Sequence, residues 1–174
     1  DEIIDLDVLA SQTKEVLDGG SDEVIAELLA LNGSSAGARP KALIGVDKER
    51  KNISYGAHQL SDGFEPWMVK FPNSQDGNNS GAIEYVYALM AKEAGIVMPD
   101  VNLFSSQKGN GYFAVKRFDR EGNKRLHMHT VSGLIHSNFR FPSLDYEDLL
   151  SLTSYLTKDI QEVEKMFRLA VFNV

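Results

Sequence analysis

The sequence of 174 residues contains no cysteine, which excludes disulfide bonds and thiolate metal sites. It also lacks a signal peptide and any apolar run approaching the ~20 residues that a membrane-spanning helix needs. The net charge of −7 argues against a general affinity for nucleic acid or anionic membranes. We therefore expect a soluble, cytoplasmic protein without membrane partners and without direct contact to nucleic acid.

The two ends of the sequence each lack a feature of a natural terminus. The first residue is Asp1 rather than an initiating methionine. At the other end, no glycine, proline or polar cap follows the apolar stripe of the last expected helix, which runs to the final residue (Ile160, Val163, Phe167, Val171 and Val174). We expect that the sequence stops within a helix and that more protein originally followed.

What is present is the composition of an ordinary globular protein, with 43% hydrophobic and 25% charged residues. The hydrophobic periodicity predicts helices at 6–17, 21–32, 82–94, 145–155 and 159–174, and strands at 41–46, 52–55, 65–71, 101–105, 111–117 and 125–130. Helices on both sides of a strand-rich region with one inserted helix indicate an α+β fold.

The expected helix at 82–94 is apolar over most of its circumference, so we expect it to be buried on more than one side. Glu84 lies near its start, and small residues follow on the same stripe (Ala88, Ala91 and Gly95). Small side chains let another element approach closely, which would place that element beside Glu84. The aromatic residues of the central region are expected in the core (Trp67, Tyr85, Tyr87, Phe113 and Phe118).

The segment at 33–41, Gly-Ser-Ser-Ala-Gly-Ala-Arg-Pro-Lys, is rich in glycine and serine and ends in basic residues. Successive backbone N–H groups in such a turn can surround an anion, and Arg39 and Lys41 add positive charge. The segment lacks the Walker pattern of four residues between glycine and Gly-Lys-Ser/Thr. It also suits a plain connection from a helix to the next strand, so by itself it leaves phosphate binding open.

Lys70 carries the single charge in the apolar run at 66–72, and Glu84 follows fourteen residues later. A phosphate-binding loop, a lysine on a strand and a carboxylate on the next helix form the nucleotide-binding half of a kinase. Each residue also has a simpler explanation. Lys70 could lay its stem over apolar surface, and an acid in a first helical turn gains ~0.5 kcal/mol from the helix dipole. The three features together favour nucleotide binding.

Several separated motifs resemble the HipA family. They are Ser34-x-Ala36-Gly37-Ala38 with Lys41, the segment 69–72 (Val-Lys-Phe-Pro), Glu84-Tyr85 leading into 89–96 and Pro99, the segment 115–120 (Val-Lys-Arg-Phe-Asp-Arg), 144–149 (Leu-Asp-Tyr-Glu-Asp-Leu) and the terminal 167–174. The sequence Arg-Phe-Asp-Arg after a predicted strand is the most specific of these motifs. The resemblance covers about residues 6–174, nearly the whole chain.

The resemblance implies a bacterial serine/threonine kinase, typically the toxin of a toxin–antitoxin pair, with a fold akin to phosphatidylinositol 3/4-kinases. The implied parts are a helical lead-in at 1–35, a nucleotide-binding N-lobe with a mostly antiparallel sheet at 36–120, and the start of an α-helical C-lobe at 121–174. ATP and Mg²⁺ are the implied cofactors. A protein substrate and a HipB-like antitoxin are the implied partners.

The resemblance also assigns site residues. The ATP-binding set would comprise Gly37, Ala38, Lys41, Lys70 and Glu84, with Lys116 and Phe118 in the hinge that reads adenine through backbone groups. The hinge position of Lys116 is acidic in a well-known member, but a backbone contact should survive this difference. Ser34 matches a serine that the family autophosphorylates, and nearly two added negative charges beside Arg39 and Lys41 could order or eject the loop.

One part of the family pattern is missing from the sequence. In the family, Phe-Asn-Val leads into an Asn-x-Asp-Asp-His-x-x-Asn catalytic loop and a later metal-binding aspartate. Phosphoryl transfer depends on Mg²⁺ and on an aspartate that positions the acceptor hydroxyl. We therefore expect no catalytic residue and no metal ligand in this fragment, and we expect Asp119 to pair with Arg117 or Arg120. His127 and His129 lack a third metal ligand at a recognisable spacing.

Two other functions stay open at this point. The chain could be a non-catalytic module that binds a nucleotide or an antitoxin, or an unrelated small α+β scaffold whose loop binds nothing. Calorimetry with ATP and Mg²⁺ separates these two possibilities.

Overall fold

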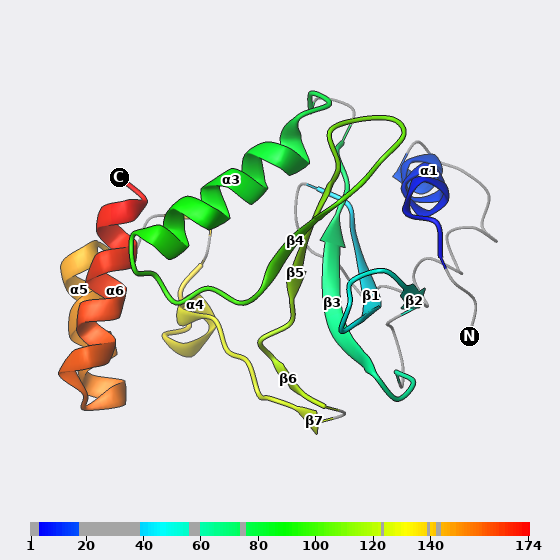
Figure 1. Ribbon diagram of the computed structural model, residues 1–174. Helices are drawn as coiled ribbons and strands as arrows, with labels where there is room; N and C mark the ends of the chain where they lie inside the picture. The colour runs from blue at the N-terminus through cyan, green and yellow to red at the C-terminus, as the bar shows by residue number, and fades with distance from the viewer. Residues whose placement is uncertain are drawn as a thin grey trace. The chain divides into compact units, whose positions relative to one another are not determined.

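The computed structural model describes residues 4–17, 39–55, 60–73, 76–122, 124–138, 140–141 and 144–174. These residues form an α+β fold with a five-stranded antiparallel sheet, a two-stranded ribbon and five helices (Figure 1). The chain divides into two compact units, Asp1–Ala88 with Pro99–Leu126, and Leu89–Met98 with His127–Val174. No helix among the described residues is long and apolar enough to cross a membrane. The helix expected at 21–32 lies outside the described residues.

The sheet belongs to the first unit and has the strand order β2-β1-β3-β5-β4. Its strands are β1 (Lys41–Asp47), β2 (Ile53–Tyr55), β3 (Phe64–Lys70), β4 (Val101–Phe104) and β5 (Tyr112–Lys116). Every neighbouring pair is antiparallel. The expected strands at 41–46, 52–55, 65–71, 101–105 and 111–117 are therefore confirmed, as is the antiparallel sheet.

Alternation of side chains on the central strands builds the core of the first unit. Successive strand residues point to opposite faces, so every second residue of β1 and β3 enters the core. The residues that do so are almost fully buried (Ala42, Ile44, Val46, Trp67 and Val69). Helix α1 (Leu6–Leu17), at the bounds expected from its pattern, adds Leu6 and Leu9 to the same cluster.

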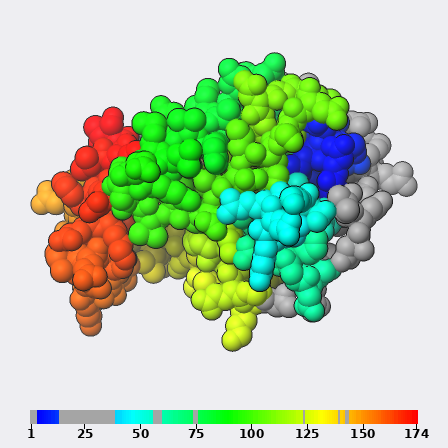
Figure 2. Space-filling model, in the orientation of Figure 1, coloured from blue at the N-terminus to red at the C-terminus, as the bar shows by residue number. Residues whose placement is uncertain are grey.

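Helix α3 (Ser80–Glu93) corrects one expectation. It was predicted to be buried on more than one side, but Val86, Tyr87 and Met90 are each more than half exposed. Figure 2 shows this helix, in green, at the surface of the face in view. The buried stripe holds the small residues Ala88 and Ala91. An apolar helix pattern shows that the residues are hydrophobic, but it does not show which of them are covered. Within the described residues, the fold covers one stripe of α3.

The second unit contains α4 (Val131–Leu134), α5 (Tyr146–Thr157) and α6 (Ile160–Phe172). Aspartates start the two long helices, because Asp145 and Asp159 each accept a hydrogen bond from a backbone N–H of the first turn, at 2.8 and 2.9 Å. Lys158 ends α5 in the left-handed conformation with φ of 53°. The helices expected at 145–155 and 159–174 are confirmed.

The strand expected at 125–130 is wrong. The chain forms a short ribbon of β6 (Arg120–Glu121) and β7 (Lys124–Arg125), and residues 126–130 belong to no strand. All residues from 124 to 130 are exposed. Among the residues that the structure describes, their alternating pattern therefore has no packed face to fill and no partner strand beyond the two-residue β6, so it cannot specify a longer strand.

Candidate functional site

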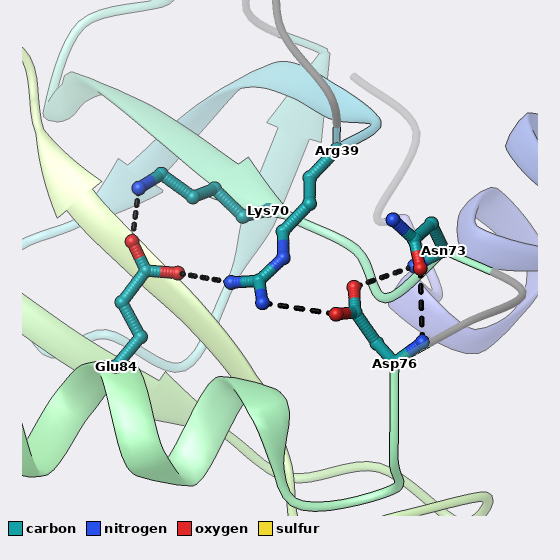
Figure 3. Close-up of polar contacts among 5 residues, drawn as sticks. All are labelled: Arg39, Lys70, Asn73, Asp76 and Glu84. Carbon is teal, nitrogen blue, oxygen red and sulfur yellow. Dashed lines mark hydrogen bonds and ion pairs between the residues drawn. The ribbon is translucent and has the colours of Figure 1, made fainter.

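Lys70 and Glu84 meet within the first unit. Lys70 is the last residue of β3, and Glu84 lies in the second turn of α3. The Lys70 Nζ donates a hydrogen bond to Oε1 of Glu84 and forms an ion pair with it (Figure 3). Both side chains are about three-quarters buried, at 26% and 25% exposure. Glu84 therefore lies within side-chain reach of β3, through the ammonium of Lys70.

The approach of α3 to the sheet depends on Gly81 in its first turn. A Cβ atom at Gly81 would lie 2.3 Å from the carbonyl oxygen of Gly111 and 3.1 Å from the amide nitrogen of Phe113. The helix thus rests directly on the backbone beside β5. Phe113 also faces the lysine, since Lys70 Nζ lies 5.3 Å from the centre of its ring. A helix that rests this close keeps Glu84 within reach of Lys70.

Arg39 extends this ion pair into a network that runs to the next loop (Figure 3). Its Nη1 lies 3.7 Å from Oε2 of Glu84, and its Nη2 donates a 2.9 Å hydrogen bond to Oδ1 of Asp76. Asp76 is held in turn by Asn73, because each residue accepts a 2.9 Å hydrogen bond from the backbone N–H of the other. The sequence analysis assigned Arg39 to an anion-binding segment, but it did not indicate that Asp76 and Asn73 would take part in the network.

Asp76 is ionised at neutral pH. The backbone N–H of Asn73 is the largest cause that lowers the pKa of Asp76 below its ordinary value of 3.8; burial, second in size, opposes it, and the Arg39 guanidinium lowers the pKa further. Arg39 therefore contacts two carboxylates at once. The only local signal for Asp76 was the Asn-x-x-Asp spacing in a polar loop, which is typical of many turns.

Lys41 lies opposite Lys70 in the register of β1 and β3. The adjoining bond from the Phe71 N–H to the Pro40 carbonyl, at 2.9 Å, makes the lysines a non-hydrogen-bonded pair, in which side chains leave the same face close together. Like charges directly opposite each other are unfavourable, so anions near them stabilise the arrangement. Ser34, Gly37 and Ala38 lie outside the described residues.

Lys116 and Phe118 lie at the end of β5. The Lys116 N–H donates to the Asp100 carbonyl at 2.8 Å, and the Arg117 N–H donates to the Pro66 carbonyl at 2.9 Å. The Phe118 N–H makes no backbone hydrogen bond within the described part of the chain. The expectation that Phe118 belongs to the core is wrong, since the turn that follows β5 directs its ring outward and leaves it 65% exposed.

A family model described as the HipA-like C-terminal domain matches residues 33–174, which is most of the chain. The chain belongs to the HipA family. A search of the curated proteins found no significant match. The matched residues include the Lys70–Glu84 pair, the Arg39 network and the end of β5, so all of these belong to the HipA-like domain.

The Arg-Phe-Asp-Arg segment of this HipA-family chain folds around Asp119. Its carboxylate accepts hydrogen bonds from Nε and Nη2 of Arg117, at 2.9 and 2.7 Å, and from Nη1 of Arg120 at 2.5 Å. Asp119 was expected to pair with one of the two arginines and pairs with both. The Arg117 side chain is the largest cause of a lowered pKa for Asp119, and the charge of Arg120 contributes. The ion pairs keep the three charged side chains mostly buried, next to the exposed Phe118 in the sequence.

Helix α1 lies outside the matched residues but is fastened to the HipA-like domain. Oδ1 of Asp7 accepts hydrogen bonds from the Ser106 hydroxyl and the Tyr112 hydroxyl, each at 2.7 Å. Its Oδ2 accepts a 2.9 Å bond from the Gln107 N–H. These bonds lower the pKa of Asp7 below 3.8, with the Gln107 N–H as the largest cause. Together with the buried Leu6 and Leu9, they join α1 to the β4–β5 connection.

Among the described residues of this HipA-family chain, no three His, Asp or Glu side chains are grouped closely enough to hold a metal ion. The rings of His127 and His129 have centres 6.0 Å apart and meet edge to face. Within the described part of the chain, no third ligand lies close enough to join these two histidines in a metal site.

Proposed function

We propose that this HipA-family chain is the ATP-binding part of a serine/threonine protein kinase, which transfers phosphate from ATP–Mg²⁺ to a protein hydroxyl in the natural protein. The observation that carries the proposal is the contact between Lys70 on β3 and Glu84 on α3. In kinases, a strand lysine held by a helix carboxylate binds the α- and β-phosphates. On this proposal the first unit is a kinase-like N-lobe.

The charges around the pair fit a triphosphate. Arg39, Lys41 and Lys70 supply three positive charges near the end of the sheet, and Glu84 and Asp76 supply two negative ones. Lys41 and Lys70 leave the same face of the sheet from directly opposite positions, in a chain that is acidic as a whole. Two cations this close to each other favour a bound polyanion. Lys70 is then the phosphate ligand, and Glu84 orients its ammonium.

The end of β5 fits the adenine. The sheet itself uses the N–H groups of Lys116 and Arg117, so neither is free to read a base. The Phe118 N–H carries no backbone bond within the described residues, and its exposed ring offers an apolar surface. We therefore assign the adenine contact to the Phe118 N–H and to the backbone carbonyl of Lys116. Mg²⁺ would neutralise charge on the phosphates, and Lys41 with loop residues Gly37 and Ala38 would complete the phosphate contacts.

Membership of the HipA family supports several further parts of the proposal. They are Ser34 as the site of autophosphorylation, a HipB-like antitoxin and a protein substrate as partners, and a division into a lead-in at 1–35, an N-lobe at 36–120 and the start of a C-lobe at 121–174. A module that binds nucleotide or antitoxin without phosphoryl transfer is the alternative.

Calorimetric titration of the chain with ATP and Mg²⁺ tests nucleotide binding. Lys70→Ala should weaken ATP binding about 10- to 100-fold, because a hydrogen bond between charged groups contributes about 1.5–3 kcal/mol. Lys51→Ala is the matched control, since Lys51 pairs with Glu49 in an exposed turn. Equal ATP affinity of Lys70→Ala and the original chain would remove Lys70 from the site. Binding of ATP without any transfer of labelled phosphate by the natural protein would favour the non-catalytic module.

A further inference from the structure

Both oxygens of the Glu84 carboxylate face a cation. Oε1 accepts from Lys70 Nζ, and Oε2 lies 3.7 Å from Nη1 of Arg39. Lys70 ends β3 and Arg39 precedes β1, and the Glu84 carboxylate, which extends from α3, lies between the two cations (Figure 3). A carboxylate held at one oxygen can still rotate, whereas contacts at both oxygens fix the plane of the group.

Arg39 is itself held from its other side. Its Nη2 donates to Asp76, whose side chain is 13% exposed, and Asp76 is bound to Asn73 through two reciprocal hydrogen bonds. The planar guanidinium can contact Glu84 and Asp76 at the same time, which a lysine ammonium on a flexible stem does less well. The network therefore fixes Arg39 although its side chain is 42% exposed.

We propose that Arg39, held by Asp76, is a positioning residue that orients the Glu84 carboxylate toward Lys70. The proposal deepens the proposed ATP site and rests on it for its effect on nucleotide binding. Arg39 acts through Glu84 and makes no contact with the phosphates. The orienting effect depends on the planar shape of the guanidinium as well as on its charge, because its two Nη atoms reach both carboxylates.

The first test needs no nucleotide. The ¹³C resonance of the Glu84 side-chain carboxyl group is compared in the original chain and in the Arg39→Gln, Asp76→Asn and Arg125→Gln variants. Arg39→Gln and Asp76→Asn should both shift this resonance, because each releases one oxygen of Glu84. Arg125→Gln is the control, since Arg125 is exposed on β7. If the Glu84 resonance has the same chemical shift in Arg39→Gln, Asp76→Asn and the original chain, the proposal is overturned.

The second test is a double-mutant cycle on ATP affinity. Arg39→Gln should weaken ATP binding about 2- to 5-fold, as expected for a partly exposed ion pair, and Arg39→Lys should recover only part of this loss. In a Glu84→Gln background, Arg39→Gln should have no further effect. Additive losses would show that Arg39 contacts the nucleotide directly, and full recovery by Arg39→Lys would show that charge alone suffices. Either result refutes the proposal.

The two tests separate the failure of this proposal from the failure of the ATP site. If the original chain binds no ATP, the proposed function fails, and the Glu84 resonance still decides whether Arg39 and Asp76 position the carboxylate. If ATP binds with the Lys70 dependence given above but Arg39→Gln leaves both affinity and resonance unchanged, the ATP site stands and the positioning role is wrong.

Discussion

Replacement of Asp119 should destabilise the turn that presents Phe118. The Asp119 carboxylate accepts two hydrogen bonds from Arg117 and one from Arg120, and the three side chains are only 17–20% exposed. Asp119→Ala removes all of these bonds and, among the described residues, leaves Arg120 with only its 2.9 Å bond to the carbonyl oxygen of residue 119. Asp119→Asn keeps the shape and one acceptor oxygen but loses the negative charge.

The burial of the cluster sets the size of the effect. Exposed ion pairs contribute about 0.2–1 kcal/mol, and removal of one partner from a buried pair costs about 3–5 kcal/mol. The Asp119 cluster lies between these limits. We expect a loss of about 2–3 kcal/mol in the free energy of unfolding for Asp119→Ala and about 1–2 kcal/mol for Asp119→Asn.

Urea unfolding followed by tryptophan fluorescence measures this loss. Trp67 is the single tryptophan of the chain, and it lies buried in the unit that contains Asp119. Asp62→Asn is the matched control, because Asp62 is exposed between β2 and β3. The control should change the free energy of unfolding by less than about 0.5 kcal/mol.

The pH dependence tests the electrostatic cause. The arginines lower the pKa of Asp119 in the folded chain below its ordinary value of 3.8. A lowered folded pKa gives stability that is fully present above the unfolded value and is lost as the pH falls through the folded value. The difference between the original chain and Asp119→Asn should therefore be full at pH 6–7 and shrink below about pH 4. An equal difference at pH 7 and pH 3 would refute the ion-pair explanation, as would an unchanged stability at pH 7.

Two further predictions concern the elements that hold the first unit together. Asp7→Asn weakens the three hydrogen bonds between α1 and the β4–β5 connection, so it should cost about 1–2 kcal/mol in urea unfolding at pH 7. The cost should shrink below about pH 4, because the stability from the lowered pKa of Asp7 is lost as the pH falls from the unfolded value of 3.8 through the folded value. Gly81→Ala brings a Cβ within 2.3 Å of a backbone carbonyl and should cost about 1–3 kcal/mol and weaken ATP, because α3 must move away from Lys70. Gly77→Ala, where an added Cβ meets nothing within 4 Å, is its control. Unchanged unfolding by Asp7→Asn, or by Gly81→Ala, would contradict the respective account.

The sequence predicted the strands and the Lys70–Glu84 contact for a physical reason. Alternating side chains on β1 and β3 state which face is buried without reference to distant residues. Lys70 and Glu84 end one element and begin the next, so a short connection limits how far apart they can lie. The motifs around them also pointed to the family that the match at residues 33–174 established.

The contact partners of Arg39 could not be predicted in this way. Arg39 and Asp76 are 37 residues apart, and nothing in the pattern of either segment states that their side chains meet. Asn73 and Asp76 lie in a polar loop whose composition indicates a turn and no more. The Arg39 guanidinium contacts both Asp76 and Glu84 because the residues before β1, the loop after β3 and α3 come together in the fold.

By itself, the sequence determined most of the local elements of this protein and its family, because hydrophobic period and motif spacing are properties of neighbouring residues; the antiparallel sheet was implied by the resemblance to that family. Only the tertiary structure decided which side of α3 is covered, where the pattern at 125–130 stops being a strand, and which carboxylates surround Arg39. Each of these depends on contacts between segments far apart in the chain, and an amphipathic or apolar pattern carries no information about which distant surface will meet it.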